Sequence, residues 1–203
     1  MEYFHEVGLE KVVGSGFRLT VEFGDTEQMV TDLSRGSLDA VIATKQIDNV
    51  NIDYLKIDQE DFCLVAPVSL ELSDDLLPLS GDDERLEHFL LNQPWISYSS
   101  ELPIIRRYWY TVFGQRPDIE PVMIVANLLL IRRAVELGLG ISILPRYICR
   151  DSLGDGRLRV PWEPDEEVCN DLWIATRKLD RNNSEIKQLV SAMRTRQARV
   201  WSQ

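Results

Sequence analysis

The stretch of sequence that decides the fold reads VMIVANLLLIRRAVELGLGISILP and spans residues 122–145. Residues 122–125 and 141–144 are short apolar runs of the kind that form buried strands. Between them, apolar residues recur at helical spacing over 128–135, and the Gly-Leu-Gly turn at 138–140 ends that helix. A strand, a helix and a strand in this order form a βαβ unit, so the stretch predicts an α/β protein.

The alternation of strand and helix continues on both sides of this stretch. Residues 17–23 alternate apolar and polar side chains, as a strand with one polar face does. A helix over 26–36 and a buried apolar strand over 38–43 follow, so another βαβ unit is expected there. Further helices are expected at residues 2–13, from Pro103 onward, and through Ile186 and Met193; Asn183 or Ser184 would cap the last of them. Further strands are expected at 54–57, 62–66, 95–98, 157–160 and 172–175.

Two successive α/β series indicate a binding protein with two lobes. We expect lobe I to combine residues 1–66 with 176–203, because the last helix can return to the first series. Residues 67–175 are expected to form lobe II, and each lobe should hold a mainly parallel sheet flanked by helices. The acidic residues between 71 and 87 are expected to form a solvated loop and the start of a helix.

Composition and charge narrow the classes of function. The chain has 203 residues, 44% of them apolar, and a formal net charge of −11, so it repels nucleic-acid phosphates as a whole. DNA binding by this chain alone is therefore not expected. No apolar run is long enough to span a membrane, and the first residues do not form a signal peptide, so we expect no membrane contact and a cytoplasmic location.

Catalytic, metal and cofactor motifs are missing from the sequence. His5 and His88 are the only histidines, and neither neighbours a nucleophile motif. Cys63, Cys149 and Cys169 have no C-x-x-C spacing, so reduced structural thiols are expected rather than a zinc site or a disulfide. No phosphate-binding or dinucleotide-binding glycine motif is present. We therefore expect no catalytic residue, no metal and no cofactor.

Several segments together carry a likeness to a known family. The most specific is the opening stretch from Val125, Ala126 and Asn127 to Pro145, followed by the Gly-Arg-Leu at 156–158. Weaker matches lie at residues 24–43, from Gly-Asp-Thr to the apolar strand, and at the Pro-Trp-Ile-Ser-Tyr of 94–98. From about residue 2 to 195, the chain resembles the LysR-type transcriptional regulators.

The resemblance implies the effector-binding, or substrate-binding, domain of such a regulator. That domain has a two-lobed fold of the periplasmic-binding-protein type II, and binds a small molecule between its lobes. Members also carry an N-terminal winged helix-turn-helix and a linker helix, which this sequence lacks. The chain is also expected to start at the first helix of the domain, without the strand and the Ser/Thr-bearing loop that precede it, through truncation, an internal start or natural loss.

The resemblance further implies a homodimer with the domains side by side and antiparallel. The helix at 26–36, the strand at 17–23 and a helix of the second lobe would form the contact. The alternating pattern at 17–23 agrees with an exposed edge strand, although a solvated sheet face would give the same pattern.

Candidate effector contacts lie at strand-to-helix junctions, where free N–H groups favour anions. The best group is Ser97, Tyr98, Ser99 and Ser100, which precede the helix at Pro103; a hydroxyl turn capping that helix is the structural alternative. Three further junction residues and one cation in the next helix complete the set: Thr44, Asn127, Thr26 and Arg106. Asn127 and Thr26 could equally serve as helix caps, Thr44 could begin a loop, and Arg106 could be solvated.

The sequence thus favours an effector-sensing regulatory domain that binds a small molecule, in the simplest case an organic anion. Two other classes share the fold. A solute-binding protein of a transporter would require a signal peptide, and a metabolic enzyme would require a cleft residue placed for acid–base chemistry.

Overall fold

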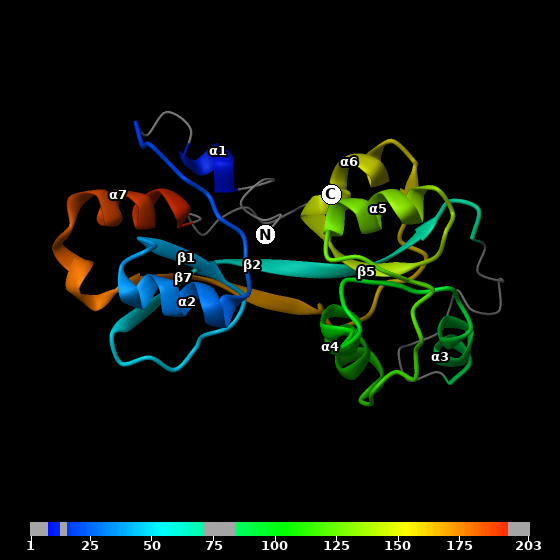
Figure 1. Ribbon diagram of the computed structural model, residues 1–203. Coiled ribbons are helices and arrows are strands. Elements are labelled where there is room, and N and C mark those ends of the chain that lie inside the picture. Colours follow the sequence, from blue (N-terminus) through cyan, green and yellow to red (C-terminus); the bar gives the residue numbers. More distant parts are fainter. Residues whose placement is uncertain (1–7, 13–15, 71–83, 195–203) are drawn as a thin grey trace. The chain divides into compact units, whose positions relative to one another are not determined.

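The computed structural model describes residues 8–12, 16–70 and 84–194. They divide into two compact units, of which unit 1 comprises residues 1–59 and 170–203, and unit 2 comprises residues 60–169 (Figure 1). The chain passes from one unit to the other within the long strand β2 (Ile52–Pro67) and at the start of β7 (Cys169–Arg177).

Unit 1 is built on a sheet in which β1 (Ala40–Ala43) pairs antiparallel with β7, and β7 lies beside β2. Helix α2 (Thr26–Arg35) covers one face of this sheet, while α1 (Leu9–Val12) and α7 (Ser184–Met193) lie on the other (Figure 1). The short 3-10 helix η2 (Lys178–Asn182) leads from β7 into α7. Local signals set the helix ends: Asp25 caps α2, Gly36 ends it with a φ of 84°, and Asn183 caps α7.

The expected strand at 17–23 is wrong. Residues 16–25 are described, and none of them belongs to a strand. Leu19, Val21 and Phe23 leave 41%, 44% and 59% of their surface exposed. Alternation suits an extended chain, but a strand also needs a neighbour to hydrogen-bond with, and the described residues provide none here. The first βαβ unit is therefore not formed, and β1 takes its partner from β7 instead.

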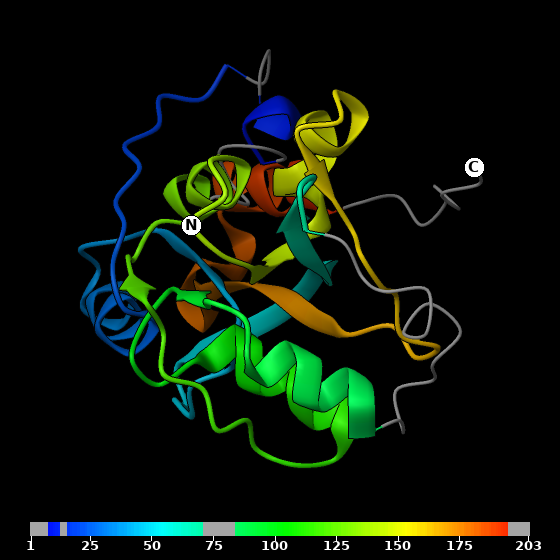
Figure 2. The ribbon, with the colours of Figure 1, turned by 90° about the vertical axis from the view of Figure 1, so that its right-hand side faces the viewer.

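Unit 2 is a sheet with helices on both faces. Strand β2 pairs antiparallel with β5 (Ser142–Pro145) and with β6 (Leu158–Arg159). Helices α3 (Glu84–Leu91) and α4 (Pro103–Phe113) lie on one face, and α5 (Leu128–Glu136) and α6 (Arg146–Gly154) lie on the other (Figures 1 and 2). Alternate residues of β2 serve the two cores, since Phe62 and Leu64 pack with α3 and α4, whereas Cys63 and Val65 pack with α5 and α6.

The βαβ prediction for the second lobe is confirmed. Strand β3 (Ile96–Ser97) pairs in parallel with β4 (Met123–Ile124), and α4 connects them. Trp95 forms a parallel bridge with Ile141 after α5. At the end of the Gly-Leu-Gly turn, a Cβ on Gly140 would lie 2.2 Å from the carbonyl oxygen of Pro94, so the backbones approach too closely for any other residue.

Other expectations need correction. The two strands expected at 54–57 and 62–66 are one continuous strand, because nothing between them breaks the extended chain. Strand directions also differ from the mainly parallel sheets we expected. The ladders β1–β7, β2–β5 and β2–β6 are antiparallel, whereas β3–β4 and the bridge at Trp95 are parallel. Helix α6, which begins directly after Pro145, was not predicted. The α/β class itself is as expected.

Two further expectations concern segments that the structure describes only in part or not at all. The helix expected at 2–13 is described only over α1, and the acidic loop at 71–83 lies outside the described residues. Cys63 and Cys149 are buried in unit 2, Cys169 is half-buried, and all three are free thiols. In the described part of the chain, no helix is both long and apolar enough to cross a membrane.

Candidate functional site

The carboxyl ends of β3 and β4 form the candidate site in unit 2. The two strands are parallel, and the Val125 N–H donates to the Ser97 carbonyl oxygen at 2.9 Å, so both strands end at the same edge. The chain then enters α4 on one side and α5 on the other. The structure thereby brings the four hydroxyl-bearing residues at 97–100 and Asn127 to one edge of the sheet. Open α/β sheets bind ligands at such an edge.

Helix α4 begins at this edge without a side-chain cap. Leu102 precedes it with a φ of 54° and a ψ of 43°, and it is the only non-glycine residue among those described with a positive φ. This left-handed conformation costs a leucine about 1 kcal/mol. Pro103 occupies the first helical position and has no N–H. The remaining N–H groups of the first turn therefore face no capping side chain, and the helix dipole favours an anion beside them.

Two serine hydroxyls at this edge already bind a carboxylate. Ser100 Oγ donates to Glu101 Oε1 at 3.0 Å. Hydrogen bonds from Ser99, from the backbone and from Ser100 lower the pKa of Glu101 below its ordinary value. These hydroxyls are therefore within hydrogen-bonding reach of a carboxylate. Glu101 itself was not among the predicted site residues. Its role as the partner of the two hydroxyls becomes visible only when the structure shows their side chains in contact.

The other two hydroxyls of the group have structural partners. Ser97 is buried and donates to the Ser99 carbonyl oxygen at 2.8 Å, a local turn that does not cap α4 as the structural alternative had supposed. Tyr98 is half-buried and packs against the apolar core between the sheet and α5. Ser99 and Ser100 are thus the hydroxyls best placed to exchange partners.

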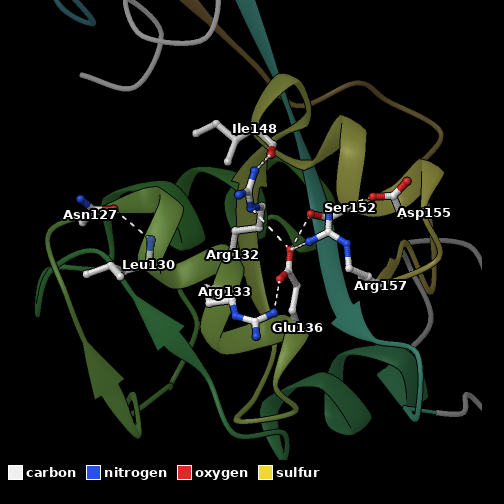
Figure 3. A network of polar contacts seen from close by, with 9 residues as sticks. All are labelled: Asn127, Leu130, Arg132, Arg133, Glu136, Ile148, Ser152, Asp155 and Arg157. Atoms are coloured by element: carbon white, nitrogen blue, oxygen red, sulfur yellow. Dashed lines mark hydrogen bonds and ion pairs between the residues drawn. The ribbon is translucent and has the colours of Figure 1, made fainter.

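Asn127 caps α5 at the same edge. Its Oδ1 accepts a hydrogen bond from the Leu130 N–H at 2.9 Å (Figure 3). Its side chain is exposed, and no hydrogen bond to its amide nitrogen is found among the described residues. The capping alternative is therefore observed, and the amide N–H₂ can still donate to a ligand.

Of the remaining predicted residues, Arg106 lies beside this group, and the two threonines belong to the other unit. Arg106, on the first turn of α4, is exposed and donates to the Glu101 carbonyl oxygen at 3.3 Å. Thr44 and Thr26 belong to unit 1. Thr44 is exposed directly after β1, and Thr26 is the first residue of α2, whose N-terminus Asp25 already caps.

The far end of α5 is held by a buried carboxylate that the sequence did not reveal. Glu136 leaves 2% of its side chain exposed and accepts hydrogen bonds from Ser152 at 2.5 Å, Arg133 at 2.8 Å and Arg157 at 2.8 Å (Figure 3). Arg132 Nε lies 3.6 Å from the same carboxylate. Burial alone would raise the pKa of Glu136, but these donors and positive charges outweigh it and lower the pKa.

The network fixes α5 against α6 and the turn that follows it. Its only sequence signal was the i, i+4 spacing of Arg132 and Glu136, which is common on solvated helices.

Elsewhere, the described residues contain no group of three or more metal-ligating side chains, and His88 is exposed on α3. His5 lies outside the described residues.

Comparison with known proteins identifies the family. The family model described as the LysR substrate binding domain matches residues 15–198. The HTH-type transcriptional regulator AbaB of Streptomyces antibioticus is 29% identical over 159 residues, which are 77% of this chain and 51% of AbaB. The Hca operon transcriptional activator HcaR of Escherichia coli (strain K12) is 27% identical over 123 residues, 61% of this chain and 40% of HcaR. The chain spans about half the length of these curated relatives or less.

Solved structures with the same fold are regulatory domains of LysR-type proteins. The reduced OxyR regulatory domain from Pseudomonas aeruginosa aligns with a TM-score of 0.71 at 19% identity, covering 95% of this chain and 91% of that one. The C-terminal domains of a LysR family protein from Agrobacterium tumefaciens align with a TM-score of 0.69 at 15% identity, covering 94% and 87%. The chain belongs to the LysR substrate-binding domain family and has the periplasmic-binding-protein type II-like fold of LysR regulatory domains.

Proposed function

We propose that this chain is the effector-sensing part of a cytoplasmic LysR-type transcriptional regulator. It binds a small molecule and controls transcription through a DNA-binding domain that lies outside these residues. The family match over residues 15–198 is the observation that carries the proposal. The curated relatives are transcriptional regulators, which favours this function over a solute-binding protein of a transporter or a metabolic enzyme.

The effector is proposed to be an organic anion that binds at the edge formed by β3 and β4. The uncapped N-terminus of α4 and the serine hydroxyls that already hold the Glu101 carboxylate support an anion. Ser99, Ser100 and the Asn127 amide are the proposed principal donors. Ser97, Tyr98 and Arg106 are further proposed contacts in unit 2, and Thr44 and Thr26 are proposed contacts in unit 1.

The proposed mechanism is a shift of population without any chemistry on the ligand. An effector that binds one conformation of the regulator better than another moves the equilibrium by its differential affinity. A ligand that displaces the Glu101 carboxylate from Ser99 and Ser100 would change the hydrogen bonds at the start of α4. This displacement would give the two states different contacts with the effector.

A homodimer is part of the proposal, and two exposed apolar patches support it. In unit 1, Leu19, Val21 and Phe23 are 41–59% exposed. In unit 2, Val122 and Ile124 on and beside β4 are 64% and 52% exposed. In a side-by-side antiparallel dimer, the first patch of each protomer would meet the second patch of its partner, with the helix at 26–36 alongside.

The dimer can be tested by light scattering after gel filtration. The variant F23D/I124D should elute as a monomer at concentrations where the unaltered chain is a dimer, because it places a carboxylate in each patch. A monomeric unaltered chain at high micromolar concentration would contradict the dimer.

Effector binding can be tested with a thermal-shift screen of small carboxylates, aromatic acids, amino acids and sugar phosphates. A compound that binds the folded chain raises the melting temperature in a concentration-dependent way. Ser100→Ala should weaken that response by removing a donor, and Asn127→Asp should weaken it by adding a negative charge while keeping the cap. Ser184→Ala, which removes an exposed hydroxyl at the start of α7, is the matched control and should respond as the unaltered chain does.

Two outcomes would count against the proposed function. A cooperative melt that no compound of the screen shifts would contradict effector binding by this chain. Conversion of a bound compound into a product would favour the enzyme alternative. Binding to duplex DNA is expected to be absent by fluorescence anisotropy at moderate salt, because the net charge is −11.

A further inference from the structure

Unit 1 contains a hollow that is separate from the edge of β3 and β4. It has a volume of about 490 Å³ and is lined by residues from the start of β2, from β7 and from α7. Volumes of about 300 to 1,000 Å³ are typical of sites for small organic ligands. Every residue that lines it belongs to unit 1.

The inner wall of this hollow is apolar. Ile174 of β7 and Ile186 of α7 are buried, at 2% and 8% exposure, and Val190 is half-buried beside them. Leu55 of β2 also lines the hollow, yet it leaves 38% of its surface exposed. Helix α7 therefore covers this face of the sheet incompletely and leaves apolar surface that a ligand could bury.

The outer wall of the hollow is positively charged. Arg181, Lys187 and Arg194 line it, together with the carboxylate of Asp53. Arg181 donates to both Asp53 oxygens, at 2.6 and 3.1 Å, and these hydrogen bonds lower the pKa of Asp53. Neither Lys187 nor Arg194 forms an ion pair with any described residue, so within that part of the chain these two positive charges have no carboxylate partner, although the net charge is −11.

Lys187 lies on α7, and Arg194 is the residue that follows its last turn, with its N–H still donating to the Val190 carbonyl oxygen. Lys187, Ser191 and Arg194 are spaced i, i+4 and i+7, so they follow one side of the helix and its C-terminal end along the hollow. Seven residues of helix separate the two cations by about 10 Å along the axis. The Ser191 hydroxyl between them adds a neutral hydrogen-bond donor.

We propose that this hollow binds an organic anion with an apolar body, of the class of medium-chain carboxylates. The alkyl chain would cover Leu55, Ile174 and Val190, and the carboxylate would pair with Lys187 or Arg194. A purely ionic ligand such as inorganic phosphate would leave the apolar wall uncovered, and a neutral hydrocarbon would leave the cations unpaired. The site shares no residue with the proposed effector contacts, so it is a second site in the same domain.

Isothermal titration calorimetry with sodium octanoate, below its micelle concentration, tests the proposal. We expect saturable binding with one site per chain. The double variant K187Q/R194Q should weaken it at least about tenfold, because it removes both uncompensated charges. Sodium acetate, which has the carboxylate without the apolar body, should show no saturable binding.

Control variants separate a local site from a general charge effect. R116Q/R150Q also removes two positive charges, but from exposed positions outside the hollow, and should bind octanoate as the unaltered chain does. Ser100→Ala should also leave octanoate binding unchanged, while it weakens an effector at the edge of unit 2. Circular dichroism melts check that each variant is folded.

Three results would overturn the inference. The first is the absence of saturable octanoate binding to the folded chain. The second is binding that K187Q/R194Q leaves unchanged or that R116Q/R150Q weakens equally. The third is loss of octanoate binding in Ser100→Ala, which would place the ligand in unit 2 instead.

Discussion

Replacing Glu136 with glutamine tests how much the buried carboxylate contributes to the stability of unit 2. The change keeps the size of the side chain and an oxygen that accepts from Ser152, but it removes the negative charge. Arg132, Arg133 and Arg157 then lose their shared partner. The expected effect is a lower free energy of unfolding without a change of fold.

The magnitude follows from the burial of each partner. Removing one partner of a fully buried ion pair costs about 3–5 kcal/mol. Arg133 and Arg157 are 58% and 43% exposed, so water solvates them after the change and their loss is small. Arg132 is only 26% exposed, and its Nε is buried with no hydrogen-bond partner among the described residues, so it loses the most. The expected loss for the glutamine variant is about 2–3 kcal/mol, below the fully buried case.

Urea unfolding followed by circular dichroism measures this loss, together with a fall in melting temperature of about 5–10 °C. Glu163→Gln is the matched control, because the same chemical change removes an ion pair to Arg146 at a carboxylate that is 58% exposed. The control should cost less than about 0.5 kcal/mol. Equal stability of Glu136→Gln and the unaltered chain would refute the reasoning. The free-energy cost of burying the carboxylate would then equal the stabilisation from its hydrogen bonds and ion pairs.

Three further predictions follow from single contacts. The free energy of unfolding should fall as the pH drops below 4.5, the ordinary pKa of a glutamate carboxyl, because the pKa of Glu136 is lowered in the folded state. The stabilisation by Glu136 is present above that pH and disappears when the carboxylate is protonated. In urea titrations, Glu136→Gln should therefore show a shallower pH dependence than the unaltered chain. Gly140→Ala should lower the free energy of unfolding by more than about 2 kcal/mol, or prevent folding, because its Cβ would meet the Pro94 carbonyl. A Cβ at Gly154 meets no atom within 4 Å, so Gly154→Ala should be neutral or stabilising by the same assay, and similar values for both variants would contradict the close approach. Asn127→Ala should cost about 1 kcal/mol through loss of the cap, and an unchanged melt would mean that the cap is dispensable.

The proposed effector edge was largely visible in the sequence, for a local reason. Ser97 to Ser100 and Asn127 follow apolar runs directly, and in a βαβ unit the ends of both strands meet at one edge. Hydrogen-bond partners were not visible in the same way. That Ser97 serves a turn, and that Ser100 holds Glu101, depends on side-chain geometry that spacing does not specify.

The hollow in unit 1 and the Glu136 network illustrate what sequence reasoning missed. Lys187, Ser191 and Arg194 look like an ordinary solvated stripe until β2 and β7 are seen beside α7. Glu136 likewise receives Ser152 and Arg157 from a helix that we did not predict and from the turn after it. In both cases the partners come from distant segments, and no pattern within one segment indicates them.

The sequence by itself determined the elements whose signals are local. Asp25 and Gly36 bound α2, Asn183 begins α7, and the stretch at 122–145 forms β4, α5 and β5 in the expected order. Caps, turns and helical periodicity act within a few residues, so they can be read without the fold. Tertiary structure alone decided the direction of the ladders, the union of two expected strands into β2, and the lack of a strand at residues 17–23, which have no strand partner among the described residues. A strand exists only through hydrogen bonds to a neighbour that can lie anywhere in the chain, and that neighbour becomes known only when the chain has folded.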